Sequence, residues 1–174
     1  MKSALTITVS LALSAAIAFA QSPSAQTSAT IGGKSLSIRY SAPSVRGRKI
    51  FGAGGLLSQD PTYPAWRAGA NSATALHTDA DLDVGGLQVP KGDYTLYAWV
   101  ADPDNWQLIF SKETGQWGLT YNAKMDLGRV KMTMSKPPAP IETYKIILSS
   151  TGPKTGQLRL EWEKHIASVP ITVK

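Results

Sequence analysis

The stretch at positions 94–100 reads Tyr94-Thr95-Leu96-Tyr97-Ala98-Trp99-Val100. Apolar side chains at 94, 96, 98 and 100 fall on one face of an extended chain, because a strand alternates its side chains between two faces. Turn-forming residues bound the stretch, with Pro90-Lys91-Gly92-Asp93 before it and Asp102-Pro103-Asp104-Asn105 after it. A period of two between turns is typical of a β-strand.

The same period recurs along the rest of the chain. Gly-Gly pairs at 32–33 and 85–86 and the Gly-Pro-Lys-Thr-Gly run at 152–156 predict turns between alternating segments. We therefore predict an all-β fold, a single-domain antiparallel β-sandwich of about 8–10 strands with one long ordered loop. The other alternating apolar sets are Leu36, Ile38 and Tyr40; Trp106, Leu108 and Phe110; Val130, Met132 and Met134; Tyr144, Ile146 and Leu148; Leu158, Leu160 and Trp162; and Val169, Ile171 and Val173.

Residues 1–20 are predicted to be a cleaved signal peptide. Lys2 supplies a positive charge, Leu5 to Ile17 is an apolar stretch, and Ala18-Phe19-Ala20 fits an A-x-A cleavage site. The apolar stretch is short and interrupted by hydroxyl residues, which disfavours the alternative of an uncleaved membrane anchor. We expect cleavage after Ala20 and a periplasmic or secreted protein that is not an integral membrane protein afterwards.

The mature chain is predicted to have two parts. Residues 21–28 are rich in Ser, Pro and Gln and are expected to be a flexible N-terminal segment. Residues 29–174 are expected to form the β-sandwich domain, which is long enough to bury a core of its own.

Composition excludes several classes of function. The chain has no cysteine, so thiolate nucleophiles and thiolate metal sites are absent. Its net charge is +6, but the basic residues are scattered and no dense basic run with interleaved aromatics is present. We therefore expect no nucleic-acid partner. The expected partner is an unknown small molecule or envelope component, and no cofactor is expected.

One long connection separates the first strand pair from the rest of the sandwich. It runs from Ala42 to about Asn71, and its glycines and prolines break any helix. Ile50-Phe51 and Leu56-Leu57 are apolar, which predicts that the loop packs onto the body of the domain. Long ordered loops in compact domains are often functional.

Several segments resemble the bacterial family called domain of unknown function 2911. The resemblance is carried by Tyr40 to Gly52, Trp66 to Thr74 and Gly86 to Leu96, then by Trp117-Gly118, Tyr121, Arg129-Val130 and Leu160-Glu161-Trp162-Glu163. It covers nearly the whole mature chain in the right order. It implies an exported, single-domain β-sandwich protein without an established activity.

The chain departs from that family pattern in two places. Ser72 stands where the family commonly has Glu, and the segment 58–62 looks longer than the usual connection. If the family's Glu pairs with an arginine, the resemblance implies that the site is altered in this chain.

A candidate ligand site comes from the polar and aromatic residues of the loop. Arginine has a planar fork that fits carboxylate or phosphate, and Asn both donates and accepts hydrogen bonds. A small anion-binding or sugar-binding pocket is one interpretation. The alternative is structural: Arg67 satisfies loop carbonyls, Trp66 fills the core and Asn71 forms a turn. The candidate residues are Tyr40, Arg46, Arg48, Trp66, Arg67 and Asn71, with Trp117 and Tyr121 as a stacking surface or as packing.

A metal site is a weaker hypothesis. His77, Asp79 and Asp81 lie at alternate positions, so on a regular strand they share a face. Asp83 continues the pattern, but Val84 and Pro90 do not fit a calcium loop. A solvated strand edge explains these charges better than a metal site does.

Three classes of function remain open from the sequence. The leading hypothesis is a non-catalytic periplasmic ligand-binding module that uses the Ala42–Asn71 loop. An envelope-associated hydrolase is an alternative, although no G-x-S-x-G motif occurs and the carboxylates Asp60 and Asp93 have no evident partner. A structural or assembly protein that pairs through an uncharged sheet edge is the third. No catalytic residue is assigned.

Overall fold

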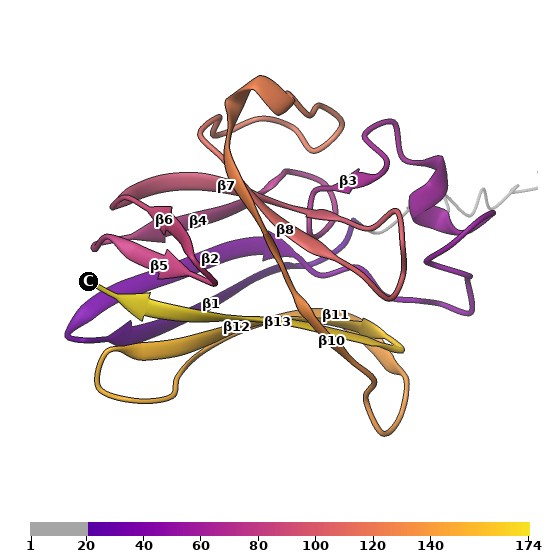
Figure 1. Ribbon diagram of the computed structural model, residues 1–174. Helices are drawn as coiled ribbons and strands as arrows, with labels where there is room; N and C mark the ends of the chain where they lie inside the picture. Colours follow the sequence, from indigo (N-terminus) through magenta and orange to yellow (C-terminus); the bar gives the residue numbers. More distant parts are fainter. Residues whose placement is uncertain (1–20) are drawn as a thin grey trace, which may run out of the picture.

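The computed structural model describes residues 21–174, and the predicted signal peptide at 1–20 lies outside the described residues. The chain forms two antiparallel sheets packed face to face, as Figure 1 shows. One sheet has the order β1 (Ser24–Ile31), β2 (Lys34–Ser41), β4 (Thr74–Thr78), β7 (Gly92–Trp99), β8 (Gln107–Ser111) and β9 (Asp126–Lys131), with β3 (Ala65–Trp66) paired to β7. The other has the order β11 (Ile141–Ser150), β12 (Thr155–Glu163), β13 (His165–Val173), β5 (Leu82–Val84) and β6 (Leu87–Val89), with β10 (Thr133–Ser135) paired to β13.

The predicted all-β antiparallel sandwich is confirmed, although the described residues contain 13 strands. The expected number was about 8–10. The additional strands include β3 and β10, which have 2 and 3 residues and are too short to display a period. The predicted hairpin turns at Gly32-Gly33 and Gly85-Gly86 join β1 to β2 and β5 to β6. Among the described residues, no helix is long and apolar enough to span a membrane.

The N-terminal segment corrects one prediction. Residues 21–28 were expected to be flexible, but Ser24–Ile31 pairs with β2 along its whole length, from Ser24 opposite Ser41 to Ile31 opposite Lys34. The Ser- and Gln-rich composition gives little hydrophobic signal, so the strand is specified by its partner rather than by its own pattern. The Thr27 hydroxyl also accepts a hydrogen bond from the Leu148 amide of β11, at 3.3 Å. Strands β1 and β11, each at the end of its sheet, therefore lie side by side.

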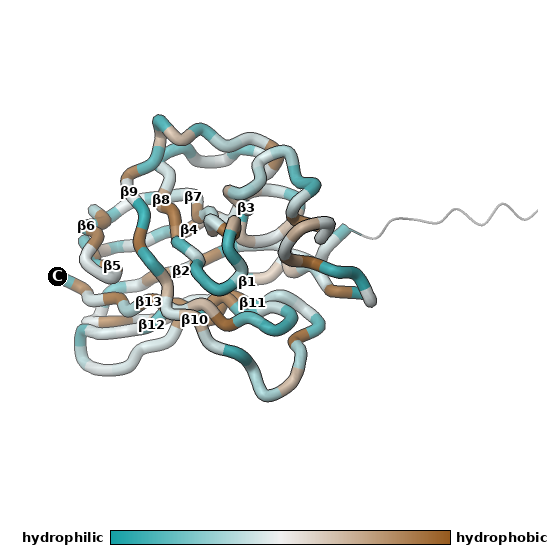
Figure 2. The backbone as a smooth tube through the Cα atoms, turned by 45° about the vertical axis from the view of Figure 1, so that its right-hand side comes forward, coloured by the Kyte–Doolittle hydropathy of each residue, from teal (hydrophilic) through white to brown (hydrophobic). Residues whose placement is uncertain are grey.

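The core between the sheets has a large aromatic cluster at one end. The Trp66 ring stacks on the Trp162 ring at a centroid distance of 5.6 Å, and it meets Tyr144 at 4.9 Å and Trp106 at 6.2 Å. Phe51, from the long loop, packs against the Trp66 ring at 6.2 Å. Figure 2 shows hydrophobic and hydrophilic segments alternating along the strands, in keeping with one buried face per strand.

The long loop is ordered by its own apolar residues. Ile50, Phe51 and Leu57 are buried in the core. The loop contains the short helix η1 (Leu56–Gln59) and strand β3, which Figure 1 shows together at one end of the sandwich.

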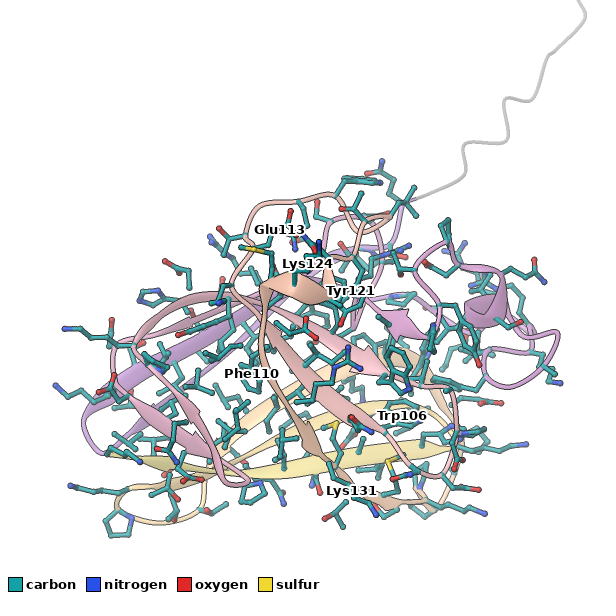
Figure 3. All side chains as sticks on the ribbon, turned by 45° about the horizontal axis from the view of Figure 1, so that its top comes forward. Trp106, Phe110, Glu113, Tyr121, Lys124 and Lys131 are labelled. Atoms are coloured by element: carbon teal, nitrogen blue, oxygen red, sulfur yellow. The ribbon has the colours of Figure 1, made fainter. Side chains whose placement is uncertain are left out.

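A second, smaller apolar cluster lies on the outer face of the first sheet. Ala65, Tyr97 and Ile109 are buried there, with Trp99 and Tyr121 packed against them. The connection between β8 and β9, which contains η2 (Ala123–Met125), covers this part of the sheet. Figure 3 shows that Tyr121 and Lys124 lie on this connection, above the sheet. The outer face of β7 at Tyr97 and Trp99 is thus partly covered.

Candidate functional site

A pocket of about 330 Å³ opens where the long loop meets the end of the sandwich. The loop supplies both walls, because η1 lies on one side and the chain after β3 lies on the other. One part of the lining is apolar, and the other consists of a charged pair and an amide. The apolar part is Pro43, Leu56, Leu57, Trp66 and Trp162; the polar part is Gln59, Asp60 and Arg67.

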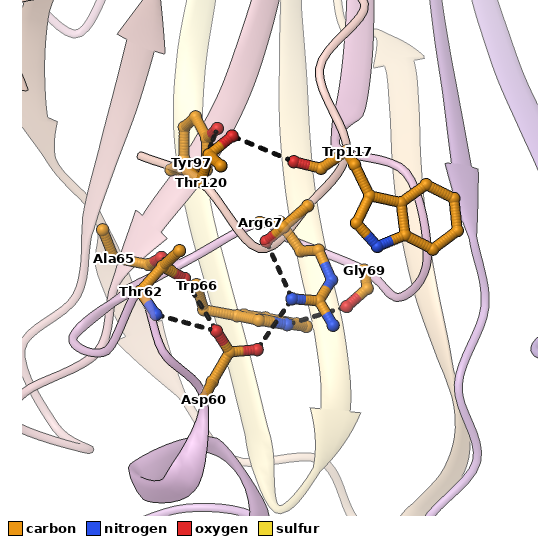
Figure 4. Close-up of polar contacts among 10 residues, drawn as sticks. Asp60, Thr62, Ala65, Trp66, Arg67, Gly69, Tyr97, Trp117 and Thr120 are labelled. Carbon is orange, nitrogen blue, oxygen red and sulfur yellow. Dashed lines mark hydrogen bonds and ion pairs between the residues drawn. The ribbon is translucent and has the colours of Figure 1, made fainter. Parts of the chain in front are cut away.

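An ion pair between Asp60 and Arg67 forms the polar wall of this pocket (Figure 4). Arg67 Nη1 lies 2.7 Å from Asp60 Oδ2, and the two side chains are only 15% and 10% exposed. The other oxygen of Asp60 accepts hydrogen bonds from the backbone amide and the hydroxyl of Thr62, at 3.0 and 2.8 Å. The Asp60 carboxylate is therefore positioned by hydrogen bonds within its own loop as well as by the ion pair with Arg67.

The connection between β8 and β9 closes over Arg67 from the opposite side. Arg67 Nη1 also donates to the carbonyl oxygen of Gly118 at 2.9 Å, and the Gly118 amide donates to the carbonyl oxygen of Asn71 at 3.2 Å. Arg67 Nε is buried and has no hydrogen-bond partner within residues 21–174. A buried donor without an acceptor costs about 1–3 kcal/mol, so the site retains an unfavourable group.

Gly118 is predicted to be required for this closure. A Cβ at position 118 would lie 1.9 Å from Arg67 Cδ and 2.5 Å from the Asn71 carbonyl oxygen. Because the backbone oxygen cannot move aside, Gly118→Ala is expected to lower the free energy of unfolding by about 2 kcal/mol in urea denaturation. Gly115→Ala in the same connection is the control: no heavy atom lies within 4 Å of its added Cβ, and only its φ of +78° is unfavourable. A loss at Gly118 no larger than that at Gly115 would contradict the packing.

The backbone of the pocket wall is unusual. Ala68 has a φ of 50° and Asn71 a φ of 59°, in the left-handed region that residues other than glycine seldom adopt. Ala68 is fully buried, so surrounding contacts hold it in this conformation. Such conformations cluster at functional sites because they position neighbouring groups, here Arg67, Gly69 and Ala70.

Asn71 and Trp66 have the structural roles that the sequence left open. The Asn71 amide nitrogen donates to the Ser22 carbonyl oxygen at 3.1 Å, which fastens the start of the described chain to the loop. Trp66 is 1% exposed and its indole N–H donates to the Gly69 carbonyl oxygen at 2.8 Å. Trp66 is therefore a core residue whose edge reaches the pocket.

Tyr40, Arg46 and Arg48 do not line this pocket. The Tyr40 hydroxyl accepts from the Ile146 amide at 3.1 Å, across the sandwich. The Arg46 backbone amide donates to Glu142 Oε1 at 2.8 Å, and the Arg48 guanidinium donates to the carbonyl oxygens of Ser44 and Val45. The contacts with Glu142 hold the first part of the loop against β11, whereas those of Arg48 lie within the loop.

Trp117 and Tyr121 do not form a common surface with Trp66. Trp117 is 53% exposed, whereas Tyr121 packs on Tyr97 at a centroid distance of 4.9 Å. The Tyr121 hydroxyl donates to Asp126 Oδ2 at 2.7 Å and accepts from Arg129. Burial, followed by the Asp126 hydrogen bond, raises the pKa of Tyr121 to about 12, so it stays protonated. Arg129 also lies over the Trp99 ring, 4.6 Å from its centroid.

The three metal candidates are engaged in other contacts. His77 Nδ1 lies 2.8 Å from Asp93 Oδ1 and His77 Nε2 lies 3.1 Å from Asp79 Oδ1, while Asp81 accepts from the Lys91 amide. No group of three or more His, Cys, Asp or Glu residues with a metal-binding arrangement occurs in the part of the chain that the structure describes.

The two histidines of the chain are predicted to titrate on opposite sides of pH 6.5. Hydrogen bonds to Asp93 and Asp79 raise the pKa of His77, and burial lowers the pKa of His165. His77 therefore adds stability below pH 6.5 that is lost as the pH rises through its folded pKa. His165 costs stability as the pH falls below 6.5, because the unfolded chain then binds the proton more readily.

NMR titration of the imidazole Cε1–H resonances measures both pKa values in one experiment. Asp93→Asn is expected to lower the pKa of His77 and to leave that of His165 unchanged. A His77 pKa below that of His165 would contradict the contacts described for both side chains.

Comparison with protein families assigns the chain. The profile of the family described as "Protein of unknown function (DUF2911)" matches residues 22–171. The chain belongs to the DUF2911 family. The match confirms the resemblance carried by the loop and strand motifs, and it covers every residue of the pocket. Neither the curated proteins nor the solved structures contain a match to this DUF2911 chain.

Sequence reasoning missed the partner of Arg67 and the apolar wall of its pocket. Asp60 precedes Pro61 and Thr62, a pattern in which an Asp side chain accepts from the amide two residues later. That pattern indicates a fixed carboxylate but does not indicate which arginine meets it.

Proposed function

We propose that this DUF2911 protein is a non-catalytic binding protein that holds a small, neutral, sugar-like ligand in the pocket beside Asp60 and Arg67. The observation that carries the proposal is a nearly buried ion pair in a pocket whose remaining lining is mostly apolar. Ligand sites are typically apolar concavities with a few fixed polar groups. Charged groups in such surroundings are costly to desolvate, which favours a role for them beyond packing.

Charge balance favours a neutral ligand over an anionic one. Asp60 compensates the charge of Arg67 at 2.7 Å, so an anion in the pocket gains little net attraction. Arg67 Nη2 has no hydrogen-bond partner among the described residues, which leaves donors for a hydroxyl oxygen. The edge of Trp66 and the side chains of Leu56 and Leu57 suit the C–H face of a sugar ring.

The two alternatives receive less support. Asp60 and Asp93 line different pockets, and each is paired, with Arg67 and His77 respectively. They therefore do not form the pair of facing carboxylates that glycoside hydrolysis requires. Pairing with a partner through a sheet edge requires an uncharged, exposed edge strand. Strand β1 has no charged residue, but its outer edge lies against β11, so it is not exposed for pairing.

The place of action is part of the proposal. The charge, apolar stretch and A-x-A motif of residues 1–20 support export to the periplasm or beyond. Expression of the full chain with its own N-terminus, followed by N-terminal sequencing of the exported protein, is expected to give Gln21 as the first residue. Retention of Met1 on protein that stays in the cytoplasm would contradict export.

Thermal melting of the mature protein against a panel of neutral sugars, muropeptides and organic anions tests the binding proposal. A ligand that binds only the folded state raises Tm by mass action. We expect a neutral sugar to raise Tm and Ala70→Phe, which places a ring in the pocket and keeps both members of the ion pair, to abolish the shift. Lys145→Phe on an exposed strand position is the size-matched control. A shift retained in Ala70→Phe, or no shift with any neutral sugar, would contradict the proposal.

A further inference from the structure

A polar groove crosses the outer face of the first sheet, away from the pocket of the long loop. It consists of two adjoining pockets of about 350 and 320 Å³ that share Arg39, Ala75 and Gly115. The sheet forms its floor, and the connection after β8 forms one wall. None of its lining residues belongs to the pocket beside Asp60 and Arg67.

Strand register explains which side chains meet in the groove. Arg39 of β2 lies opposite Ala75 of β4, and Ala75 lies opposite Thr95 of β7. Since side chains alternate, the next row on the same face holds Ser37, His77 and Asp93. Ala75 lies between Arg39 and Thr95, and its small side chain leaves open space beside the Arg39 side chain.

Arg39 is exposed, and its guanidinium forms no hydrogen bond or ion pair with residues 21–174. Arg67 and Arg129, by contrast, are held by carboxylates, and Arg48 is held by loop carbonyls. A free guanidinium offers a planar fork of donors that matches a carboxylate. The Arg39 Cα is held in place because β2 pairs with β1 on one side and with β4 on the other.

The two ends of the groove differ in charge. At one end, Asp93 and its partner His77 are present, and Asp79 also contacts the imidazole. These aspartates disfavour an anion near them. The other end is neutral and rich in hydroxyl and amide groups, from Ser24, Ser41, Ser72 and Gln116. An anionic group is therefore best placed at Arg39, with the rest of the ligand toward the neutral end.

We propose that this groove binds an acidic sugar, with the uronate carboxylate on Arg39 and the ring hydroxyls on the serine side chains of the neutral end. Ala73 and Ala75 provide small apolar surfaces under the ring. The serine hydroxyls of the neutral end both donate and accept, as sugar hydroxyls require, whereas the Gln116 amide is held by Thr95 and Tyr97 and forms a fixed wall. This second site is separate from the neutral-sugar pocket, and neither depends on the other.

Isothermal titration of the mature protein with sodium glucuronate, and with glucose as the neutral analogue, tests the assignment. We expect glucuronate to bind and to bind more tightly than glucose, with affinity that falls as NaCl is raised. Arg39→Gln is expected to weaken glucuronate binding about tenfold or more and to remove the preference over glucose. Lys145→Gln, which removes an exposed charge on the other sheet, is the control and is expected to bind as the parent protein does.

Two further variants separate the groove from the loop pocket. Ser72→Tyr is expected to block the neutral end and weaken glucuronate binding, whereas Ala70→Phe leaves it unchanged. Melting curves confirm that the exposed Arg39 and Ser72 variants are folded. Absence of glucuronate binding, equal affinity in Arg39→Gln, or a loss caused by Ala70→Phe would overturn the assignment.

Discussion

Replacement of Trp66 by alanine is expected to lower the free energy of unfolding by about 4 kcal/mol. The Trp66 ring is 1% exposed and lies among Trp106, Tyr144 and Trp162, with Phe51 on the loop side. Removal of the ring leaves a cavity that the surrounding rings cannot fill, because they belong to both sheets and to the loop. The same change removes the indole donor of the Gly69 carbonyl oxygen.

Urea denaturation measures this loss, with Trp117→Ala as the matched control. Trp117 is 53% exposed, so its removal is expected to change the free energy of unfolding by about 0.5 kcal/mol or less. Comparable losses in the two variants would mean that Trp66 is a surface residue of the loop rather than the link between the loop and the core.

Replacement of Asp60 by asparagine is expected to lower the free energy of unfolding by about 3 kcal/mol. The amide can still accept from Thr62, but it places an NH₂ group or an uncharged oxygen opposite Arg67 Nη1. The guanidinium then stays largely buried without a counter-charge, and its Nε already has no partner among the described residues. Loss of one partner of a buried pair is more costly than loss of both.

Asp79→Asn is the control for this prediction. It also removes a carboxylate from an ion pair, but the side chains of Asp79 and His77 are 52% and 46% exposed. Exposed pairs contribute little, so a change of at most about 0.5 kcal/mol is expected. The double variant Asp60→Asn, Arg67→Met is expected to recover part of the stability lost in Asp60→Asn. Further loss in the double variant would show that the pair is not coupled.

The strands that the sequence predicts best are those with one wet face and one buried face. The alternation of Leu158, Leu160 and Trp162 is reproduced by β12, in which these three are the buried large apolar side chains. The first half of β1 was missed because Ala, Thr, Ser and Gln give no hydrophobic contrast, and its pairing depends on β2 and β11. The sequence places Trp99 on the strand face opposite Leu96 but does not show that the connection before β9 folds back over that face.

The site was predicted only in part, for a related reason. Arg67 and Trp66 are adjacent in sequence, so their common place on the loop could be predicted. The suggestion that Arg67 satisfies a loop carbonyl agrees with its hydrogen bond to the Gly118 carbonyl oxygen. Convergence of Arg46, Arg48 and Tyr40 on the same pocket was wrong, because the start of the loop is held by Glu142 and β11. Contacts between segments far apart in sequence are decided by the packed fold, and local patterns do not contain them.

The most direct test of the binding proposal is a ¹H–¹⁵N spectrum of the five tryptophan indole N–H groups during titration with a neutral sugar that raises Tm. The Trp66 indole N–H donates to Gly69, and both residues line the pocket, as does Trp162. We predict that the Trp66 and Trp162 resonances shift on binding while the Trp99 resonance, on the outer face of the sheet, does not. Shifts confined to Trp99 or Trp117, or no shift at saturation, would contradict a ligand site beside Asp60 and Arg67.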